Sequence, residues 1–222
     1  MKEPEFWEDV ISEVPVIVEF KNNWQQILKE LQEYLSTVGE WALINYPNIR
    51  VGEDPGAENL PRLYTGTWRN TVVGIPPDDK MTAWGGKFVE NYVREKFDLD
   101  IHDVVKSVQQ FLPTIHRISS ELEDLGHLYN GFISILSPGT VITPHRGDSR
   151  LMRIHLGLVC DPECVITVGD QSRVWREGEI IAFKDGGPYL HSVAHNGTAD
   201  RWVLVFDLTL DYLRSVANHP AL

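Results

Sequence analysis

Short strand-forming runs follow one another closely through the second half of the chain, and their spacing constrains the fold more than any other feature. They are rich in Val, Ile and Leu and are separated by turn residues such as Gly169-Asp170 and Glu177-Gly178. Asn196-Gly197 is predicted to be a hairpin turn. Strands this close, with no helices between them, indicate an antiparallel barrel or sandwich. The predicted strands are residues 129–136, 151–159, 165–168, 180–183, 191–194 and 202–210.

Helical patterns dominate before residue 128. Apolar residues recur at helical spacing in residues 24–35, 88–93 and 104–111, and short extended pieces are predicted at residues 16–20 and 41–46. Helices that precede such a sheet pack on one of its outer faces. The predicted fold is therefore mainly β with N-terminal helices, an α+β class.

Length and charge narrow the class of protein. A chain of 222 residues fits one domain, here a helix-rich part at residues 1–127 followed by a β core at residues 128–212. The formal net charge of −12 argues against a general nucleic-acid binder, because neutralising phosphates requires clustered Lys and Arg. No apolar run is long enough to span a membrane, and the N-terminus MKEPEFWEDV lacks the apolar stretch of a signal peptide. A cytoplasmic location is expected, and in that reducing compartment Cys160 and Cys164 are predicted to be free thiols.

Two histidines and an arginine on strand-like stretches carry the chemical signal. His145 follows Pro144, His191 opens a later run, and Arg201 directly precedes the last run. Imidazole suits iron(II), which keeps open positions for a co-substrate and oxygen, and a guanidinium binds a carboxylate bidentately. A lone histidine is more often a satisfied polar residue, and a lone arginine is more often an exposed charge. The three together favour a metal site that holds a keto-diacid.

The motifs around these residues resemble those of a known family. The stretch SPGTVITPHRGDSRLMRIHLGL is followed by WREGEIIAF, by the histidine of PYLHS and by RWVLVFDL. In order, spacing and flanking residues, these motifs are similar to the aspartyl/asparaginyl β-hydroxylases, a family of iron and 2-oxoglutarate dependent oxygenases. The N-terminal half carries no matching motif. The resemblance implies a double-stranded β-helix, a jelly-roll and cupin-like barrel that holds the metal between two sheets.

The resemblance also implies a role for individual residues. His145 and His191 would bind the metal. Arg201 would bind the distal carboxylate of 2-oxoglutarate, with Ser134 as its hydrogen-bonding partner.

Arg153 and His155 match the family residues that face the cofactor and the substrate, and Arg153 is expected to take part in catalysis. Both have the same parity along one predicted strand, so their side chains share a face. The apolar Met152, Ile154 and Leu156 share the other face. Parity alone leaves open which face points into the barrel, and the resemblance favours the face of Arg153 and His155.

The position of the usual third iron ligand holds no carboxylate. Many iron(II) oxygenases use two histidines and a carboxylate that follows the first histidine by two residues, and here that residue is Gly147. Asp148 comes one residue later, where strand alternation points it away from the metal unless a turn redirects it. The resembling family also has Gly there. The ion would then take water or another small ligand at this position, and a halide in that place would make the chain a halogenase.

The implied activity is that of an Fe(II)/2-oxoglutarate-dependent dioxygenase. With O2 it would hydroxylate an unactivated C–H bond and release succinate and CO2. Arg150 and Arg153 would suit a small-molecule or peptide substrate that bears a carboxylate, such as an aspartyl or asparaginyl residue, an amino acid or a small acid. Aromatic residues of the N-terminal half either line the substrate pocket or belong to the core. Further candidate contacts there are Trp41, Tyr64, Trp68, Trp84 and Arg69.

Two other functional classes use the same kind of barrel. A cupin-like metal-dependent isomerase or lyase would need no 2-oxoglutarate, which leaves Arg201 without an obvious ligand. A non-catalytic barrel would bind a small molecule without turnover. Iron-dependent succinate release distinguishes the dioxygenase from both of these classes.

Overall fold

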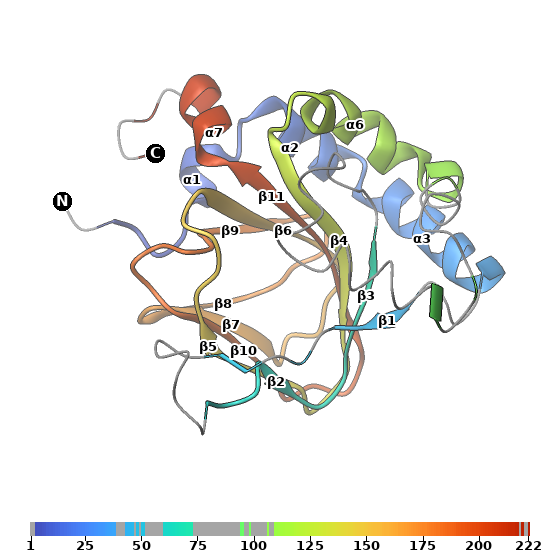
Figure 1. Ribbon diagram of the computed structural model, residues 1–222, viewed down its shortest axis with the longest axis vertical. Helices are drawn as coiled ribbons and strands as arrows, with labels where there is room; N and C mark the ends of the chain where they lie inside the picture. The colour runs from blue at the N-terminus through green and yellow to red at the C-terminus, as the bar shows by residue number, and fades with distance from the viewer. Residues whose placement is uncertain are drawn as a thin grey trace.

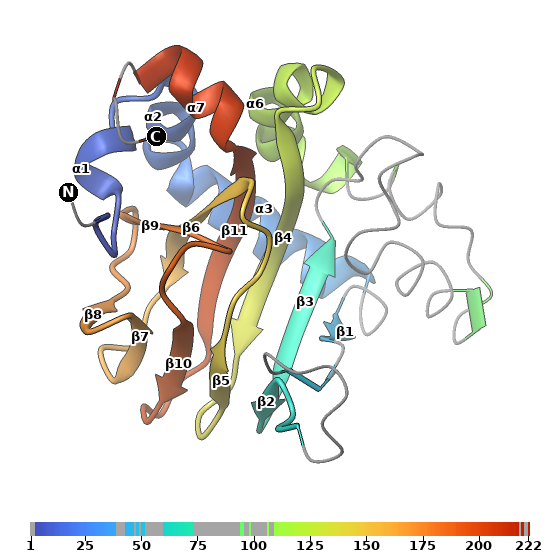
Figure 2. The same cartoon turned by 60° about the vertical axis from the view of Figure 1, so that its left-hand side comes forward.

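Two antiparallel sheets face each other in the computed structural model, and helices lie along the outer face of one of them (Figure 1, Figure 2). The structure describes residues 3–38, 43–46, 48, 50–51, 60–72, 94–95, 98, 106, 109–217, 219 and 222. No helix in this part of the chain is long and apolar enough to cross a membrane.

The larger sheet has six strands in the order β1-β3-β4-β11-β6-β9. Its long central strands pair in antiparallel fashion, with β11 between β4 and β6. The strands are β1 (Ile44–Asn45), β3 (Trp68–Val72), β4 (Leu128–Leu136), β11 (Arg201–Thr209), β6 (Leu151–Val159) and β9 (Ile180–Lys184).

The smaller sheet has five strands in the order β2-β5-β10-β7-β8. Its strands are also antiparallel, and β10 lies between β5 and β7. The strands are β2 (Tyr64–Thr65), β5 (Val141–His145), β10 (His191–His195), β7 (Cys164–Val168) and β8 (Gln171–Val174).

The mainly β prediction with helices on one face is confirmed, and each of the six predicted runs contains a strand. Two features differ from expectation. The sheets do not close into a continuous barrel, because among the described strands none of one sheet pairs with a strand of the other. Asn196-Gly197 is not a hairpin turn, since it links β10 of the smaller sheet to β11 of the larger.

The helices are α1 (Glu8–Ile11), α2 (Pro15–Asn22), α3 (Trp24–Val38), α6 (Pro113–Asp124) and α7 (Leu210–Ala217). The helix predicted at residues 24–35 is confirmed as α3. The extended piece predicted at residues 16–20 was wrong, because Val16, Ile17 and Phe20 bury one face of α2. Pro15 opens this helix, a position where its missing N–H costs nothing. The prediction at residues 88–93 lies outside the described residues, and that at 104–111 lies largely outside them.

One apolar core lies between the helices and the larger sheet. Met152, Ile154 and Leu156 of β6 point into it, as do Leu204 and Phe206 of β11. Alternate residues on the same strands therefore point the other way, toward the smaller sheet. This assigns Arg153, His155 and Arg201 to the space between the sheets.

The second core fills that space. Val203 and Val205 of the larger sheet meet Ile142, Ile166 and Val193 of the smaller one. The polar groups described below are embedded in this apolar setting, which excludes water from them.

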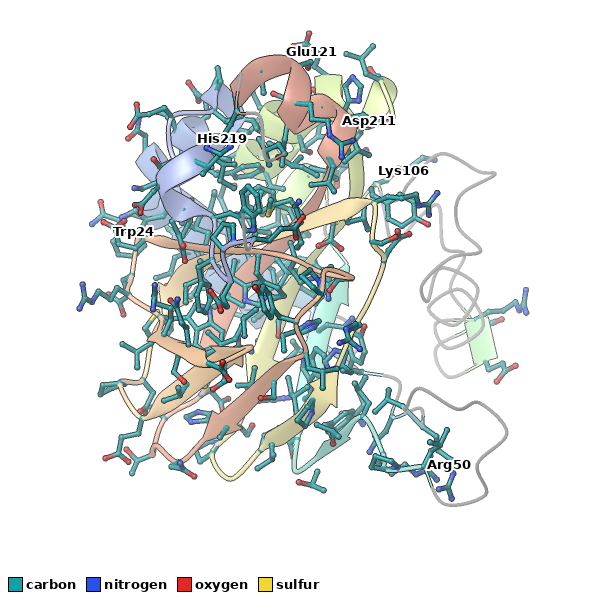
Figure 3. All side chains as sticks on the ribbon, turned by 90° about the vertical axis from the view of Figure 1, so that its left-hand side faces the viewer. Trp24, Arg50, Lys106, Glu121, Asp211 and His219 are labelled. Carbon is teal, nitrogen blue, oxygen red and sulfur yellow. The ribbon has the colours of Figure 1, made fainter. Side chains whose placement is uncertain are left out.

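The ends of the described chain lie near each other (Figure 1). His219 lies beside α1 (Figure 3), with its ring edge-on to Trp7 at a centroid distance of 6.2 Å. The N–H of Trp7 donates to the carbonyl of Ala182 on β9, so the N-terminal segment is fixed to the edge of the larger sheet.

Candidate active site

His145 and His191 stand directly opposite each other on the neighbouring strands β5 and β10. Their ring centroids are 4.2 Å apart. Nδ1 of His145 lies 2.7 Å from the carbonyl of Thr143, to which it donates when it carries the proton. That tautomer leaves Nε2 of His145 as the lone-pair nitrogen, as is usual for a metal-binding histidine.

Both imidazoles are held in the neutral form. Burial lowers the pKa of His145. Burial, and then the neighbouring His145, hold the pKa of His191 well below its usual value. Neutral imidazole is the form that binds a metal ion. The pair therefore fits a divalent cation, and Nδ1 of His191 makes no hydrogen bond within the described residues.

Asp185 brings a carboxylate to this pair from the loop between β9 and β10. Its side chain occupies the space that a β-carbon on Gly147 would need. Oδ2 accepts the N–H of Asp148 at 2.9 Å. Oδ1 lies 3.7 Å from Nε2 of His191 and 2.8 Å from Nη1 of Arg153, an ion pair whose angle makes no hydrogen bond. Burial raises the pKa of Asp185, against the opposing effect of Arg153.

The two histidines form a pair of candidate metal ligands without a third protein ligand beside them in the described residues. Among the described residues, no three His, Cys, Asp or Glu side chains are arranged to hold a metal ion. Asp185 lies beside the pair, with its Oδ1 3.7 Å from Nε2 of His191.

Arg153 is locked in place by two carboxylates. Asp207 of β11 accepts Nε at 2.9 Å and Nη2 at 2.8 Å, while Asp185 lies on the other side of the guanidinium. Burial alone would lower the pKa of Arg153, but Asp185 and Asp207 raise it. The guanidinium is therefore rigid, charged and already paired.

Arg201 has the opposite character. It is 2 % exposed, and no carboxylate pairs with it among the described residues. Its Nη2 donates to Oγ of Ser134 at 3.0 Å, and its Nε has no partner. Burial lowers the pKa of Arg201 to about 10. A buried guanidinium without a counter-ion is costly unless a ligand supplies the negative charge.

Ser134 is shared between two donors. Besides Arg201, the indole N–H of Trp68 donates to its Oγ at 2.9 Å. A hydroxyl that accepts two hydrogen bonds still has its own proton to donate. Ser134 and Arg201 together thus present donors to an anion between the sheets.

His155 lies next to this anion-binding pair. It is buried, and its Nδ1 makes no hydrogen bond within the described chain. Burial, then Arg201 and Arg153, hold the pKa of His155 well below its usual value. Its ring stacks against Trp175 at 5.8 Å between centroids and meets Phe183 edge-on at 5.5 Å.

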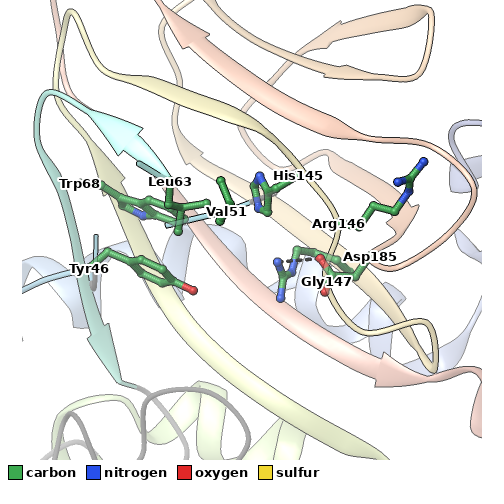
Figure 4. Close-up of a pocket in the computed structure, with 9 residues that line it drawn as sticks. Tyr46, Val51, Leu63, Trp68, His145, Arg146, Gly147 and Asp185 are labelled. Atoms are coloured by element: carbon green, nitrogen blue, oxygen red, sulfur yellow. Dashed lines mark ion pairs between the residues drawn. The ribbon is translucent and has the colours of Figure 1, made fainter. Parts of the chain in front are cut away.

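A pocket opens beside the histidine pair (Figure 4). One wall is apolar and the other is polar. On the apolar side, Tyr46 stacks flat on Trp68 with centroids 3.8 Å apart, and burial raises the pKa of Tyr46 to about 12, so its hydroxyl stays protonated. The lining residues are Tyr46, Val51, Leu63, Trp68, His145, Arg146, Gly147, Arg153 and Asp185.

Comparison with known sequences decides the family. The sequence profile described as Aspartyl/Asparaginyl beta-hydroxylase matches residues 21–210, which include both histidines, Ser134 and Arg201. The chain belongs to the aspartyl/asparaginyl β-hydroxylase family. This family assignment agrees with the resemblance of the sequence motifs.

Individual relatives match this chain over a shorter stretch. Aspartate beta-hydroxylase domain-containing protein 2 of Mus musculus is 42 % identical over 83 residues, which cover 36 % of this chain and 24 % of that protein. Domain-containing protein 1 of Homo sapiens is 36 % identical over 83 residues, covering 36 % and 21 %. The match thus spans about a quarter or less of the length of these relatives. Among solved structures, a predicted oxalate decarboxylase from Thermotoga maritima aligns with 74 % of this chain and 94 % of its own, at 13 % identity and a TM-score of 0.38.

Several of the contacts predicted from the sequence lie away from this site. Arg150 pairs with Asp148, its side chain is 70 % exposed, and neither residue lines the pocket. Arg69 donates to Asp200 at 2.8 Å. Tyr64 is buried, and its hydroxyl donates to the carbonyl of Tyr46, whereas Trp41 and Trp84 lie outside the described residues.

Several residues of the site were missed by sequence reasoning, among them Asp207, which pairs with Arg153. Asp185 follows Lys184 at the end of a predicted strand and precedes Gly186-Gly187, so it looked like part of a turn. Trp175 and Tyr46 carried no spacing signal, although Trp175 opens the motif WREGEIIAF. The predicted free thiols are confirmed for Cys160 and Cys164.

Proposed function

We propose that this chain is an Fe(II)- and 2-oxoglutarate-dependent dioxygenase that hydroxylates an unactivated C–H bond. The observation that carries the proposal is the contrast between its two buried arginines. Arg153 is paired with two carboxylates, whereas Arg201 is paired with none among the described residues. A dicarboxylate co-substrate supplies the missing counter-ion for Arg201.

The residues present fit an iron(II) ion. His145 and His191 are neutral, opposed and close enough to bind one ion, and the hydrogen bond to Thr143 orients the ring of His145. The carboxylate of Asp185 adds negative charge beside the cation, at the place where a side chain on Gly147 would otherwise stand. Asp185 would accept a hydrogen bond from a water molecule bound to the ion.

The residues also fit 2-oxoglutarate. Arg201 and Ser134 would hold its distal carboxylate, and Arg153 and His155 would face its keto end. When bound, iron and 2-oxoglutarate supply with O2 the oxidant that places one oxygen atom in the substrate, while succinate and CO2 leave. The chain itself contributes orientation and a dry setting. Val203, Val205 and the apolar face of the smaller sheet keep bulk water from the anchored carboxylate.

The substrate enters through the pocket beside His145. We propose that it bears a carboxylate, as the sequence suggests, and Arg146 and Arg153 are the two arginines that line the pocket. Arg153 already neutralises Asp185 and Asp207, and Nη2 of Arg146 donates to the carbonyl of Pro188. Because both arginines already have partners, the need for a carboxylate must be tested directly. The screen therefore compares each candidate acid with its amide, which lacks the negative charge.

Halogenation is disfavoured by the position of Asp185. A halide bound beside the histidines would need the space next to Gly147, and that space holds a carboxylate. Like charges a few ångströms apart in a buried site repel strongly.

Succinate release tests the proposal. The iron-loaded chain is incubated with 2-oxoglutarate, oxygen and the acid/amide panel, and products are read as a mass gain of one oxygen atom. We expect succinate in the wild type, less without iron, and none above background in His191→Ala. Binding of metal without binding of 2-oxoglutarate in anaerobic calorimetry would instead identify a cupin-like enzyme. Ligand binding without any turnover would identify a binding protein.

A further inference from the structure

We infer that Trp175 is a positioning residue for the 2-oxoglutarate carboxylate, because its indole fixes the planes of Arg201 and His155 together. The inference rests on the proposed function and adds a residue for which neither the motif reading nor the family match assigns a role. The guanidinium carbon of Arg201 lies 4.6 Å from the Trp175 ring centroid. The imidazole of His155 stacks on the same indole with an interplanar angle of 21°.

The need for such support follows from the few hydrogen bonds that Arg201 makes. Within the described residues, its guanidinium donates one hydrogen bond, from Nη2 to Ser134, and its Nε has no partner. One hydrogen bond leaves a guanidinium free to rotate about that contact. A ring face at cation–π distance restricts this rotation, and the attraction is largest where water is excluded. Trp175 is 2 % exposed, so the contact is dry.

His155 depends on the same indole. Its Nδ1 makes no hydrogen bond, so packing and not hydrogen bonding sets the plane of its ring. Trp175 lies on one side and Phe183 meets the ring edge-on. The two groups assigned to opposite ends of the co-substrate therefore share one aromatic support.

The loop that carries Trp175 is itself rigidly attached. Trp175 follows β8 and precedes β9, so it lies where the chain crosses from the smaller sheet to the larger. The N–H of Gly178 donates to the carbonyl of Gly157 at 2.9 Å, and the N–H of Gly157 donates to that of Glu179 at 3.0 Å. A β-carbon at Gly157 would collide with the carbonyl of Arg176. Only glycine at this position lets the loop press Trp175 against Arg201.

The indole N–H of Trp175 is a further unused donor. It is buried and has no partner in the described part of the chain. Replacing Trp175 by Phe removes the N–H and weakens the cation–π contact while keeping a ring, and replacing it by Leu removes both. The two variants therefore weaken the contact with Arg201 to different degrees, and neither alters a residue assigned to the metal.

The test is an anaerobic titration of the Fe(II)-loaded full chain with 2-oxoglutarate, in parallel with a titration of the apo chain with Mn(II). We expect the Kd for 2-oxoglutarate to rise roughly tenfold in Trp175→Phe and further in Trp175→Leu, as for loss of a desolvated cation–π contact. The Kd for Mn(II) should stay within about twofold, because Trp175 touches neither His145 nor His191. Trp202→Phe is the matched control, since Trp202 neighbours Arg201 but packs on the helix side of the sheet. It should leave both constants unchanged.

Two results would overturn the inference. One is an unchanged Kd for 2-oxoglutarate in the Trp175→Leu variant, provided that a cooperative thermal transition shows the variant to be folded. The other is a parallel loss of Mn(II) and 2-oxoglutarate affinity in Trp175→Phe, which would assign the indole a general structural role. If the wild type itself fails to bind 2-oxoglutarate, the proposed function fails as well, so the two failures are distinct.

Discussion

The carboxylate of Asp185 fills the space beside Gly147 that a side chain on that glycine would need. A carboxylate near the histidine pair is thus supplied from the loop after β9 and not from the strand that carries His145. An Asp at position 147 and the Asp at position 185 cannot coexist in this arrangement.

The first prediction is a swap of these two residues. Asp185→Gly should weaken Mn(II) binding by roughly 10- to 100-fold, as for loss of a supporting carboxylate. Gly147→Asp should weaken it as well, because the new side chain collides with Asp185. The double variant should recover most of the affinity, because it restores one carboxylate without the collision. Calorimetric titration of each metal-free variant with Mn(II) measures the three affinities. A double variant that binds Mn(II) no more tightly than the weaker single variant would show that the carboxylate cannot be supplied from position 147.

The second prediction concerns the shape of the guanidinium at position 201. Arg201→Lys keeps the charge but loses the planar fork, so the Kd for 2-oxoglutarate should rise about ten- to hundredfold. Metal affinity should be unaffected. Arg69→Lys serves as the control, since that arginine pairs with Asp200 and does not line the pocket. Equal effects of both substitutions on the Kd would contradict a specific role for Arg201.

The third prediction concerns the two carboxylates that pair with Arg153. Asp207→Asn leaves a buried guanidinium short of charge compensation, and unfolding in urea should show a loss of about 3–5 kcal/mol. The pair of Arg150 and Asp148 gives the contrast, because the Arg150 side chain is exposed and Arg150→Ala should leave the urea unfolding curve nearly unchanged. A small loss in Asp207→Asn would mean that Asp185 alone balances the charge.

The fourth prediction is the pH dependence of the metal-free chain. His145, His155 and His191 have lowered pKa values when folded, so below about pH 6.5, their ordinary value, the unfolded chain binds more protons. Stability should be level above that pH and fall as the pH drops through 6 toward 5. Asp185 and Glu8, whose pKa values burial raises, act in the opposite direction and reduce the slope.

Urea unfolding at several pH values measures this slope. His155→Gln removes one of the three groups, so its stability should fall less steeply with decreasing pH than that of the wild type. A steeper fall in the variant would contradict the burial of a neutral His155.

The fifth prediction tests the helical layer apart from the site. Glu30 of α3 accepts the backbone N–H of Thr114 at 3.1 Å and its hydroxyl at 2.6 Å, and so caps the start of α6. Glu30→Ala should cost about 1–2 kcal/mol, as for loss of a helix cap, and lower the melting temperature by about 2–8 °C. Glu33→Ala, on the exposed side of α3, should change it little. Affinity for 2-oxoglutarate should be the same in all three proteins.

The sequence predicted those parts of the fold whose residues carry their own signal. The strands with Val, Ile and Leu at regular spacing were found, but β5 was not among the predicted runs, because Pro144 interrupts it. Val16, Ile17 and Val18 mimic a strand. The burial of Val16 and Ile17 in the core beneath the helices, together with Pro15, favours a helix instead. β8 is exposed along its whole length and has no apolar pattern to detect.

In the candidate site, too, the residues that lie within sequence motifs were predicted and the others were not. His145, His191, Arg201 and Ser134 lie within motifs, and the structure brings the two histidines together and Arg201 onto Ser134. Asp185 could not be found, because its relation to Gly147 depends on how two loops meet.

The histidine pair belongs to the five-stranded sheet, whereas Ser134, Arg153, His155 and Arg201 all belong to the six-stranded one. A chain in which either layer has formed alone therefore lacks half of the candidate site. Under the proposed function, 2-oxoglutarate can react only after the two layers have docked, so folding of the sandwich must be complete before the co-substrate is consumed.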